Sequence, residues 1–374
     1  MNILILNPVM YTGSLTTYEI PKVESLKDTM MYNMCLGFKH NGHDVTLAVA
    51  EEYRPIKEEN YDFDILFFKS NFKKIFPPVV IPFSLSLLKY LRLNKNKFDL
   101  FITSDAFSFV SMFASIVDSK KTLIWHEIAK HQKKLHQIPS KIIYNIVCPL
   151  LMKHSFVIPR SHDAYRFISR YLNNVSTIPV EHGINGNVFQ PSSIKRKQFV
   201  VVAQLIKRKN ISSIIEKFTR FLKKYDSEYE LYILGRGPLK ESLEKQARDM
   251  RVDAKVVFTG QVPHSQAAPI ISESAAMLID TLQDNNMVSI PETIACGTPI
   301  LTNSIPTNSG YITDLNCGIV KDGWNENDMY KIASDKNYSI ACCKNRHRFL
   351  CEHQANLMIE IWKKSVYNND NVEK

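Results

Sequence analysis

The sequence of 374 residues has no long uninterrupted apolar run. Its most apolar region, residues 76–93, is broken by three prolines and carries two basic side chains, which is not the composition of a membrane span. The first residues lead directly into the segment ILIL without a basic region or a small-residue cleavage site, so we expect no secretory signal. We therefore expect a cytoplasmic location, and leave peripheral attachment to the inner face of the cell membrane open.

Cysteine is sparse and shows no disulfide framework. The chain has seven cysteines, an odd number without a repeating pattern, which fits a reducing compartment. Cys343, His347 and Cys351 recur every four positions and would share a helical face, as zinc ligands could. No CxxC pair accompanies them, so we interpret them as part of a C-terminal helix with buried cysteines and expect no metal.

Acidic residues are scarce in one long segment of the first half of the chain, residues 65–160. The net charge is +10, and residues 65–160 hold 15 basic residues against four acidic ones. In the basic region 69–97 lysines and arginine flank an apolar run, which fits either an element that binds an anionic membrane surface or a solvated basic face. We expect no nucleic-acid partner, because the high isoelectric point comes without a zinc-finger, RNP or helix-turn-helix signature.

The length predicts two domains, and the order of apolar segments predicts their class. Strand-like runs alternate with helix-like stretches twice over, which indicates an α/β fold with parallel sheets and crossover helices. The first helix is expected over about residues 26–40. Residues 175–193 are rich in Gly, Asn, Pro and Ser, as a connector would be.

Two carboxylates mark the most informative segment, residues 284–301 (DNNMVSIPETIACGTPIL). Asp284 and Glu292 lie eight residues apart across a loop that runs into a helix. Pro291 suits the first turn of that helix, whose free amides and dipole attract phosphate, and Gly297 ends it. The two carboxylates can accept hydrogen bonds from sugar hydroxyls, although acidic residues that merely cap a helix give the same pattern.

Two further loops follow predicted strands of the second half. The turn KRKN contains Lys209, a charge suited to a diphosphate, and GRGP contains Gly235 and Gly237, which allow close backbone approach. In a parallel sheet these loops meet at the same edge as the carboxylate segment. GRGPLKES does not have P-loop spacing, so the pattern excludes an ATP-hydrolysing site of that kind.

The order of these motifs resembles that of a known family. INGNVFQP, AQLIKRKN, LGRGPLKESLE, VVFTGQV and ETIACGTPIL follow one another as in retaining GT-B glycosyltransferases of the family 4 type, the glycosyl transferases group 1. The resemblance covers most of residues 176–320. The first half matches more loosely, through its opening strand, a GHDV turn and a histidine, His126, at the end of a central strand.

The resemblance implies two Rossmann-like domains whose parallel sheets face an interdomain cleft. An acceptor-side domain over residues 1–180, completed by a C-terminal helix of about 351–374, would precede a nucleotide-sugar domain over 181–350. The implied reaction is metal-independent, retaining transfer of a hexosyl unit from a nucleotide diphosphate sugar to a hydroxyl of a glycan acceptor, including a lipid-linked one, in surface polysaccharide or glycoconjugate assembly. Beyond that co-substrate no cofactor is implied.

The resemblance also assigns residues by position. It implies catalytic roles for His126, Lys209 and Asp284, with Lys209 on the diphosphate, Asp284 on the transferred sugar and Glu292 on the ribose. Backbone near Val262 would lie by the base. The full donor-binding set comprises Gly13, Gln204, Lys209, Gly235, Gly237, Val262, Asp284, Asn286, Met287, Val288, Ser289 and Glu292.

The sequence departs from the family pattern at three points, of which Gln204 and Asn286-Met287 favour an alternative function. Gln204 stands where the family has Arg, so that Lys207 or Arg208 would have to supply the second charge. Asp284 replaces a longer Glu, and Asn285-Asn286-Met287 replaces Gly-Phe-Gly. The alternative is a non-catalytic GT-B-like partner protein that binds a nucleotide sugar.

Overall fold

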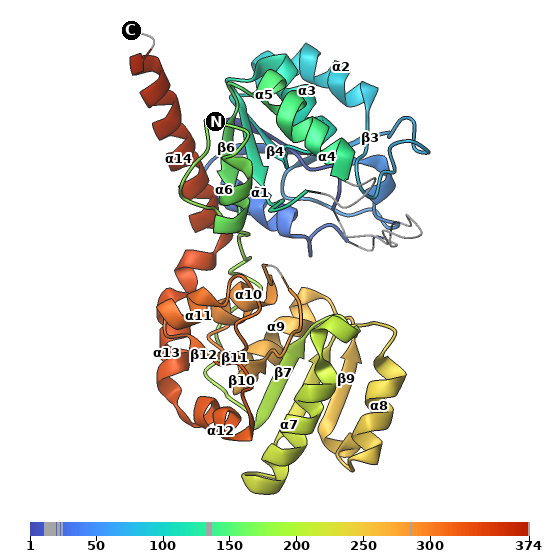
Figure 1. The fold of residues 1–374 in the computed structure, drawn as a ribbon, viewed down its shortest axis with the longest axis vertical. Helices are drawn as coiled ribbons and strands as arrows, with labels where there is room; N and C mark the ends of the chain where they lie inside the picture. Colours follow the sequence, from blue (N-terminus) through green and yellow to red (C-terminus); the bar gives the residue numbers. More distant parts are fainter. Residues whose placement is uncertain (11–19, 21–22, 24, 132–136, 285, 373–374) are drawn as a thin grey trace. The chain divides into compact units, whose positions relative to one another are not determined.

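The computed structural model describes residues 1–10, 20, 23, 25–131, 137–284 and 286–372, and the chain forms two compact units. Unit 1 comprises residues 1–183 and 351–374, and unit 2 comprises residues 184–350. Each unit is built on a six-stranded parallel sheet with helices on both faces (Figure 1). The predicted α/β class with parallel sheets is confirmed.

Unit 1 has the strand order β3-β2-β1-β4-β5-β6. Its strands are β1 (Asn2–Leu6), β2 (Asp44–Ala50), β3 (Asp64–Phe68), β4 (Leu100–Ser104), β5 (Thr122–His126) and β6 (Phe156–Pro159). Its helices are α1 (Met30–His40), α2 (Leu85–Asn94), α3 (Phe109–Asp118), α4 (Ile138–Ile142), α5 (Cys148–Leu151), α6 (His162–Ile168) and α14 (Cys351–Val372). The central strands are mostly apolar and buried because helices cover both faces of the sheet.

Helices α1 and α14 pack closely on one face of this sheet. A Cβ at Gly37 would lie 2.2 Å from the carbonyl oxygen of Cys351, so only glycine permits the observed approach. Helix α1 starts at Met30, not near residue 26, because the Thr29 hydroxyl accepts a hydrogen bond from the Tyr32 amide at 3.3 Å and caps the helix there.

Unit 2 has the strand order β12-β11-β10-β7-β8-β9. Its strands are β7 (Gln198–Val202), β8 (Glu230–Leu234), β9 (Val256–Gly260), β10 (Ala276–Leu278), β11 (Ile300–Thr302) and β12 (Gly318–Val320). Its helices are α7 (Ile211–Lys224), α8 (Lys240–Asp249), α9 (His264–Glu273), α10 (Ser289–Ala295), α11 (Gly310–Asp314), α12 (Glu326–Ser334) and α13 (Lys336–Asn345). The short strand β12 was not predicted.

The strand order determines where loops can form a binding site. In unit 2 the chain proceeds outwards from β7 to β8 and β9 on one side, and from β10 to β11 and β12 on the other. The loops that follow β7 and β10 therefore diverge at the centre of the sheet, which is where open α/β sheets bind ligands. Among the described helices, none has both the length and the apolar composition that crossing a membrane requires.

Candidate functional site

The two central loops of unit 2 are tied together by backbone contacts. The Leu282 amide donates to the carbonyl oxygen of Arg208 at 2.7 Å, and the Thr281 hydroxyl donates to the same oxygen at 2.9 Å. The loop after β7 thus lies directly against the loop after β10. This contact brings the KRKN turn next to the first carboxylate of the 284–301 segment.

Lys209 and Asp284 form an ion pair at this junction. The lysine ammonium donates to Asp284 Oδ2, and the two side chains are only 10% and 11% exposed. Arg208 approaches the other carboxylate oxygen, with Nη1 at 3.2 Å from Oδ1, and also donates to the carbonyl of Gln283. Two cations thus share one carboxylate, which leaves the cluster with a net positive charge.

A second ion pair supports the junction. Lys217 Nζ lies 2.7 Å from Asp280 Oδ2, and its ammonium lies 4.0 Å from the centre of the Trp324 ring. The indole N–H of Trp324 donates to the Ile279 carbonyl at 2.9 Å. Asn210, in a left-handed conformation with φ of 50°, donates to the same Asp280 oxygen. These contacts fix both loops on the end of the sheet.

Asn308 holds the loop between the two predicted carboxylates. Its side-chain oxygen accepts from the Met287 amide at 3.1 Å, and its amino group donates to the Met287 carbonyl at 2.9 Å. This clamp is buried and shapes the entry into α10. The amides of Val288 and Ser289 make no hydrogen bond to another described residue.

Helix α10 is too short for its dipole to attract an anion strongly. It begins at Ser289, two residues before Pro291, and spans only seven residues. Because so few peptide units align, the dipole contributes less than the sequence analysis assumed. What the segment offers to an anion is therefore chiefly the two amides of Val288 and Ser289.

Glu292 lies one turn into α10 and is buried. Its carboxylate is 3.8 Å from Nε2 of His264, the first residue of α9, and the His264 ring packs edge-on against Phe189. Glu292 belongs to the helix that follows the loop after β10, at the carboxyl edge of the sheet that also carries the Lys209–Asp284 pair. Gly297, with φ of 66°, ends α10.

The GRGP glycines serve the packing of loops. A Cβ at Gly235 would lie 1.9 Å from the Ala203 carbonyl oxygen, and one at Gly237 would lie 2.4 Å from that of Leu205. The space that the glycines leave is thus filled by the neighbouring loop. Gln204 in that loop is exposed, and Val262, before α9, is half-buried.

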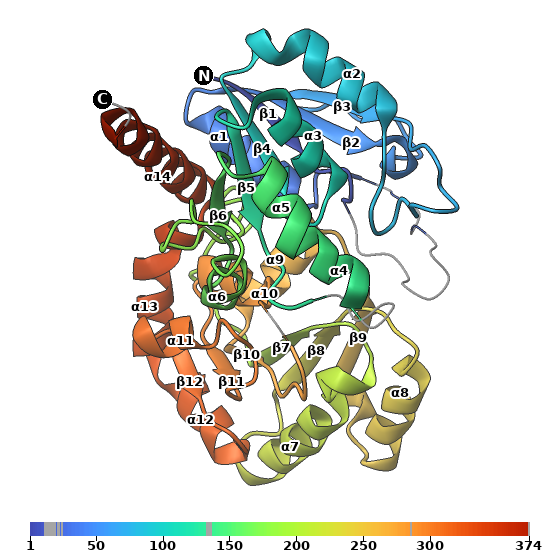
Figure 2. The ribbon, with the colours of Figure 1, turned by 45° about the horizontal axis from the view of Figure 1, so that its top comes forward.

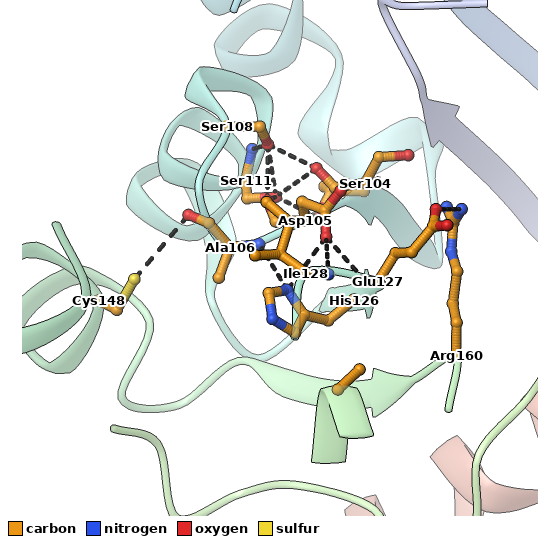
Figure 3. Close-up of polar contacts among 12 residues, drawn as sticks. Ser104, Asp105, Ala106, Ser108, Ser111, His126, Glu127, Ile128, Cys148 and Arg160 are labelled. Atoms are coloured by element: carbon orange, nitrogen blue, oxygen red, sulfur yellow. Dashed lines mark hydrogen bonds and ion pairs between the residues drawn. The ribbon is translucent and has the colours of Figure 1, made fainter. Parts of the chain in front are cut away.

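Unit 1 carries a separate polar cluster at the carboxyl ends of its own strands (Figure 3). Asp105, directly after β4, accepts from the amides of Glu127 at 2.7 Å and Ile128 at 3.2 Å, and its Oδ1 lies 3.2 Å from His126 Nδ1. Burial alone would raise the pKa of Asp105, but the hydrogen bond and charge of His126, with Arg160 and the Glu127 amide, lower it to about 2.

His126 is fully buried in this cluster. Its ring lies against Tyr144 and Phe167, with ring centres 6.1 and 6.3 Å away, and its Nε2 has no partner among the described residues. The contacts that the structure shows thus position Asp105. Contact of His126 with a sugar stays a prediction.

Arg160 extends the cluster after β6. Its Nη1 lies 2.8 Å from Glu127 Oε2 (Figure 3). The guanidinium carbon lies 3.9 Å from the centre of the Trp125 ring. Stacked and paired in this way, the guanidinium is nearly buried. It gives the edge of unit 1 a fixed positive charge.

Several residues considered in the sequence analysis do not lie in these clusters. Gly13 and Asn285 lie outside the described residues. Cys343 is exposed in α13, whereas Cys351 is buried at the start of α14, beside Gly37 of α1. In the part of the chain that the structure describes, no group of three or more His, Cys, Asp or Glu side chains could hold a metal ion.

Sequence reasoning missed several residues of these clusters, among them Asp105, Arg160, His264 and Asn308. Asp105 and Arg160 immediately follow strands, so the rule that parallel strands end at one edge would have placed them there. His264 follows a predicted strand and loop in the same way. No sequence pattern identifies Asn308, because its role depends on its hydrogen bonds to the backbone of Met287.

Comparisons with known proteins follow the same division of the chain. Residues 185–335 match the family described as Glycosyl transferases group 1. The Alpha-monoglucosyldiacylglycerol synthase of Streptococcus pneumoniae (strain ATCC BAA-255 / R6) is 25% identical over 133 residues, which make up 36% of this chain and 30% of that protein. The matched stretch thus spans less than a third of that relative.

Solved structures match over nearly the whole chain. A glycosyltransferase from Rickettsia africae ESF-5 has a TM-score of 0.66 at 13% identity, covering 98% of this chain and 99% of that one. Sucrose-phosphate synthase from Thermosynechococcus elongatus has 0.63 at 14%, covering 97% and 98%. Anabaena Alr3699/HepE in complex with UDP has 0.63 at 10%, covering 97% and 100%. Unit 2 is therefore a glycosyl transferases group 1 domain, in a chain that has the GT-B fold.

Proposed function

We propose that this protein is a retaining glycosyltransferase that moves a hexosyl unit from a nucleotide diphosphate sugar to a hydroxyl of a glycan acceptor. The observation that carries this proposal is the Lys209–Asp284–Arg208 cluster at the centre of the unit 2 sheet, where cations and a carboxylate lie together. The neighbour HepE is described in complex with UDP and with UDP-glucose, which supports a nucleotide sugar as donor.

The donor fits these groups by charge. Lys209 and Arg208 bind the diphosphate, with the amides of Val288 and Ser289 as further donors, and Glu292 accepts hydrogen bonds from the ribose. As phosphate oxygens take over the two cations, the Asp284 carboxylate is released to accept hydrogen bonds from sugar hydroxyls. Arg208 thereby supplies the charge that is missing at Gln204.

In this reaction the protein chiefly positions the two substrates and stabilises the charge of the leaving diphosphate. The bond from the anomeric carbon to the diphosphate oxygen breaks, the acceptor oxygen bonds to that carbon on the same face, and the departing phosphate takes the acceptor proton. Negative charge grows on the leaving diphosphate, so preorganised cations at that point lower the barrier. In this mechanism Lys209 and Arg208 do so without a metal ion.

We place the protein in the cytoplasm, peripherally on the inner face of the cell membrane, with a lipid-linked glycan as acceptor in assembly of a surface polysaccharide or glycoconjugate. The relative from Streptococcus pneumoniae is named as the synthase of a glycolipid, which supports a lipid acceptor. In the basic region 69–97, Val79, Leu87 and Leu91 are buried, so only part of its apolar composition can reach a membrane.

The second candidate is a non-catalytic partner protein that binds a nucleotide sugar without transferring it. The exposed, uncharged Gln204 favours it, because the family has a cation there. Nucleotide-sugar binding without turnover across a broad acceptor panel would support this candidate.

A transfer assay distinguishes the two. Donor hydrolysis and transfer are measured over a panel of nucleotide sugars for the wild type, Lys209→Ala and Glu292→Ala. Lys209→Ala should lower turnover by roughly two orders of magnitude or more. The matched control is Lys207→Ala, which removes an exposed lysine from the same turn and should leave turnover unchanged. Equal rates in all four proteins would contradict the assignments.

A further inference from the structure

An apolar stripe runs along the outside of unit 1. Helices α4 and α5 are joined by a π-helical turn at Ile143–Val147 into one continuous helical run (Figure 2). On it Ile138, Ile142, Ile146 and Leu150 are 56%, 49%, 60% and 75% exposed. Single exposed apolar side chains are ordinary, whereas four on one helix face form a contiguous patch, which calls for a partner.

The four-residue spacing along the helical run explains why these apolar side chains remain exposed. Ser140, Tyr144, Cys148 and Met152 face the core of unit 1 at the same four-residue interval. Residues two positions apart point in nearly opposite directions on a helix, so the second set of four must face away from the core. The wide π-helical turn reduces the drift of four-residue steps around the helix, which keeps the stripe straight.

The charge beside the stripe identifies its partner. Lys141 and Lys153 are exposed on the same helical run or directly after it. Residues 128–162 contain no Asp or Glu at all and six Lys or Arg. Lysines that flank exposed aliphatic residues on a surface helix match the interface of an anionic bilayer, where the apolar face enters the acyl boundary and the ammonium groups meet lipid phosphates.

We propose that the stripe Ile138, Ile142, Ile146 and Leu150, with Lys141 and Lys153, is the surface by which this protein lies on an anionic lipid membrane. A second copy of the chain fits this face less well, because its lysines would meet lysines. Attachment here would bring unit 1 to lipid-linked acceptors. It does not depend on the donor chemistry of unit 2, since none of these residues belongs to the nucleotide-sugar site.

The test measures partition of the full-length protein onto vesicles of phosphatidylcholine with and without phosphatidylglycerol. The triple variant Ile142→Gln, Ile146→Gln, Leu150→Gln should bind at least roughly tenfold more weakly, because it lacks three exposed aliphatic side chains that would enter the bilayer. The matched control is Ile56→Gln, Ile116→Gln, Ile178→Gln, which removes three apolar side chains of similar exposure from unit 1, outside both the stripe and the basic region 69–97, and should retain binding.

Two further variants test separately the contribution of the lysine charges and the depth to which the stripe enters the bilayer. Lys141→Gln with Lys153→Gln should weaken binding to the anionic vesicles and reduce its dependence on salt. Ile146→Trp should show a blue shift and quenching by brominated lipid beyond those of the wild type, in which Trp125 and Trp324 are buried and Trp362 is half-buried. UDP binding, measured separately, should be the same in all these variants.

Three results would overturn the assignment. One is a wild type that does not bind anionic vesicles at low salt. Another is equal binding by the triple variant, or loss of binding by the control with substitutions at Ile56, Ile116 and Ile178. The third is a wild type that forms a dimer in solution and that the triple variant converts to a monomer, since the stripe would then be a protein interface.

Discussion

The side chains of Lys209 and Asp284, 75 residues apart in the sequence, form an ion pair that is about nine-tenths buried. Arg208 contacts the second oxygen of the same carboxylate. Without ligand, Asp284 therefore neutralises part of the charge that a diphosphate would use. The carboxylate and an incoming diphosphate compete for the same two cations.

This competition predicts opposite effects from one substitution. Asp284→Asn removes the internal counter-charge, so free UDP should bind several-fold more tightly, while transfer should fall by roughly a hundredfold because the sugar loses its acceptor group. Calorimetric titration with UDP and a transfer assay measure the two effects. If affinity and turnover fell together, Asp284 would have only a structural role.

Asn308 should act on donor binding through Met287. Asn308→Ala removes both hydrogen bonds of the clamp and leaves buried backbone groups unpaired, at a cost of about 1–3 kcal/mol in stability. The released loop should also raise the KM for the donor roughly tenfold. Asn345→Ala, which loses hydrogen bonds to Leu315 and Ala341 elsewhere in unit 2, is the control and should affect stability alone. Equal KM values in both variants would exclude the positioning role.

The depressed pKa of Asp105 predicts an acid-dependent stability. Its folded pKa is about 2, whereas an unperturbed aspartate has a pKa near 3.9. The folded state thus binds fewer protons, and the stabilisation, on the order of 2 kcal/mol, is present above about pH 4 and is lost as the pH falls towards 2. Asp105→Asn suits the left-handed backbone, with φ of 56°, and lacks this titration.

Urea unfolding of wild type and Asp105→Asn across this range measures the difference directly. The gap between their free energies of unfolding should be largest near neutral pH and should narrow below pH 4. A gap that stayed constant down to acid pH would mean that Asp105 has no such pKa shift.

The glycines after β8 should be irreplaceable for packing. Gly235→Ala would place a Cβ 1.9 Å from the Ala203 carbonyl oxygen, at φ of 145°, and Gly237→Ala would meet the Leu205 carbonyl. Each should lower the free energy of unfolding by roughly 2 kcal/mol or more. Gly310→Ala has nothing within 4 Å of its new Cβ and should change stability by less than about 0.5 kcal/mol. Comparable stability in the three variants would contradict the packing role.

The sequence predicted the fold class because strands of a parallel sheet are apolar throughout and alternate with helices. Segments such as QFVVVAQL and FDLFITS could therefore be recognised as strands from their apolar composition. The three-residue strand β12 gave no comparable signal, being too short for periodicity. The start of α1 was misplaced by four residues because a cap at Thr29, and not the apolar pattern, sets it.

The site was predictable where it depends on position along a strand and unpredictable where it depends on contacts. Lys209 and Asp284 could be assigned to one edge, since both follow strands of one sheet. Their direct pairing could not, because side-chain rotamers and the shorter Asp decide it. Likewise, the burial of His126 beneath Tyr144 and Phe167 depends on helices distant in sequence.

The most direct test is calorimetric titration of UDP and a panel of nucleotide sugars into the wild type, Lys209→Ala and Lys207→Ala. The central claim is that unit 2 binds a nucleotide diphosphate sugar at the loops after β7 and β10. We expect one site per chain in the wild type and in Lys207→Ala, and at least roughly tenfold weaker binding in Lys209→Ala. Absence of binding by every nucleotide sugar, or equal affinity in all three proteins, would contradict the claim.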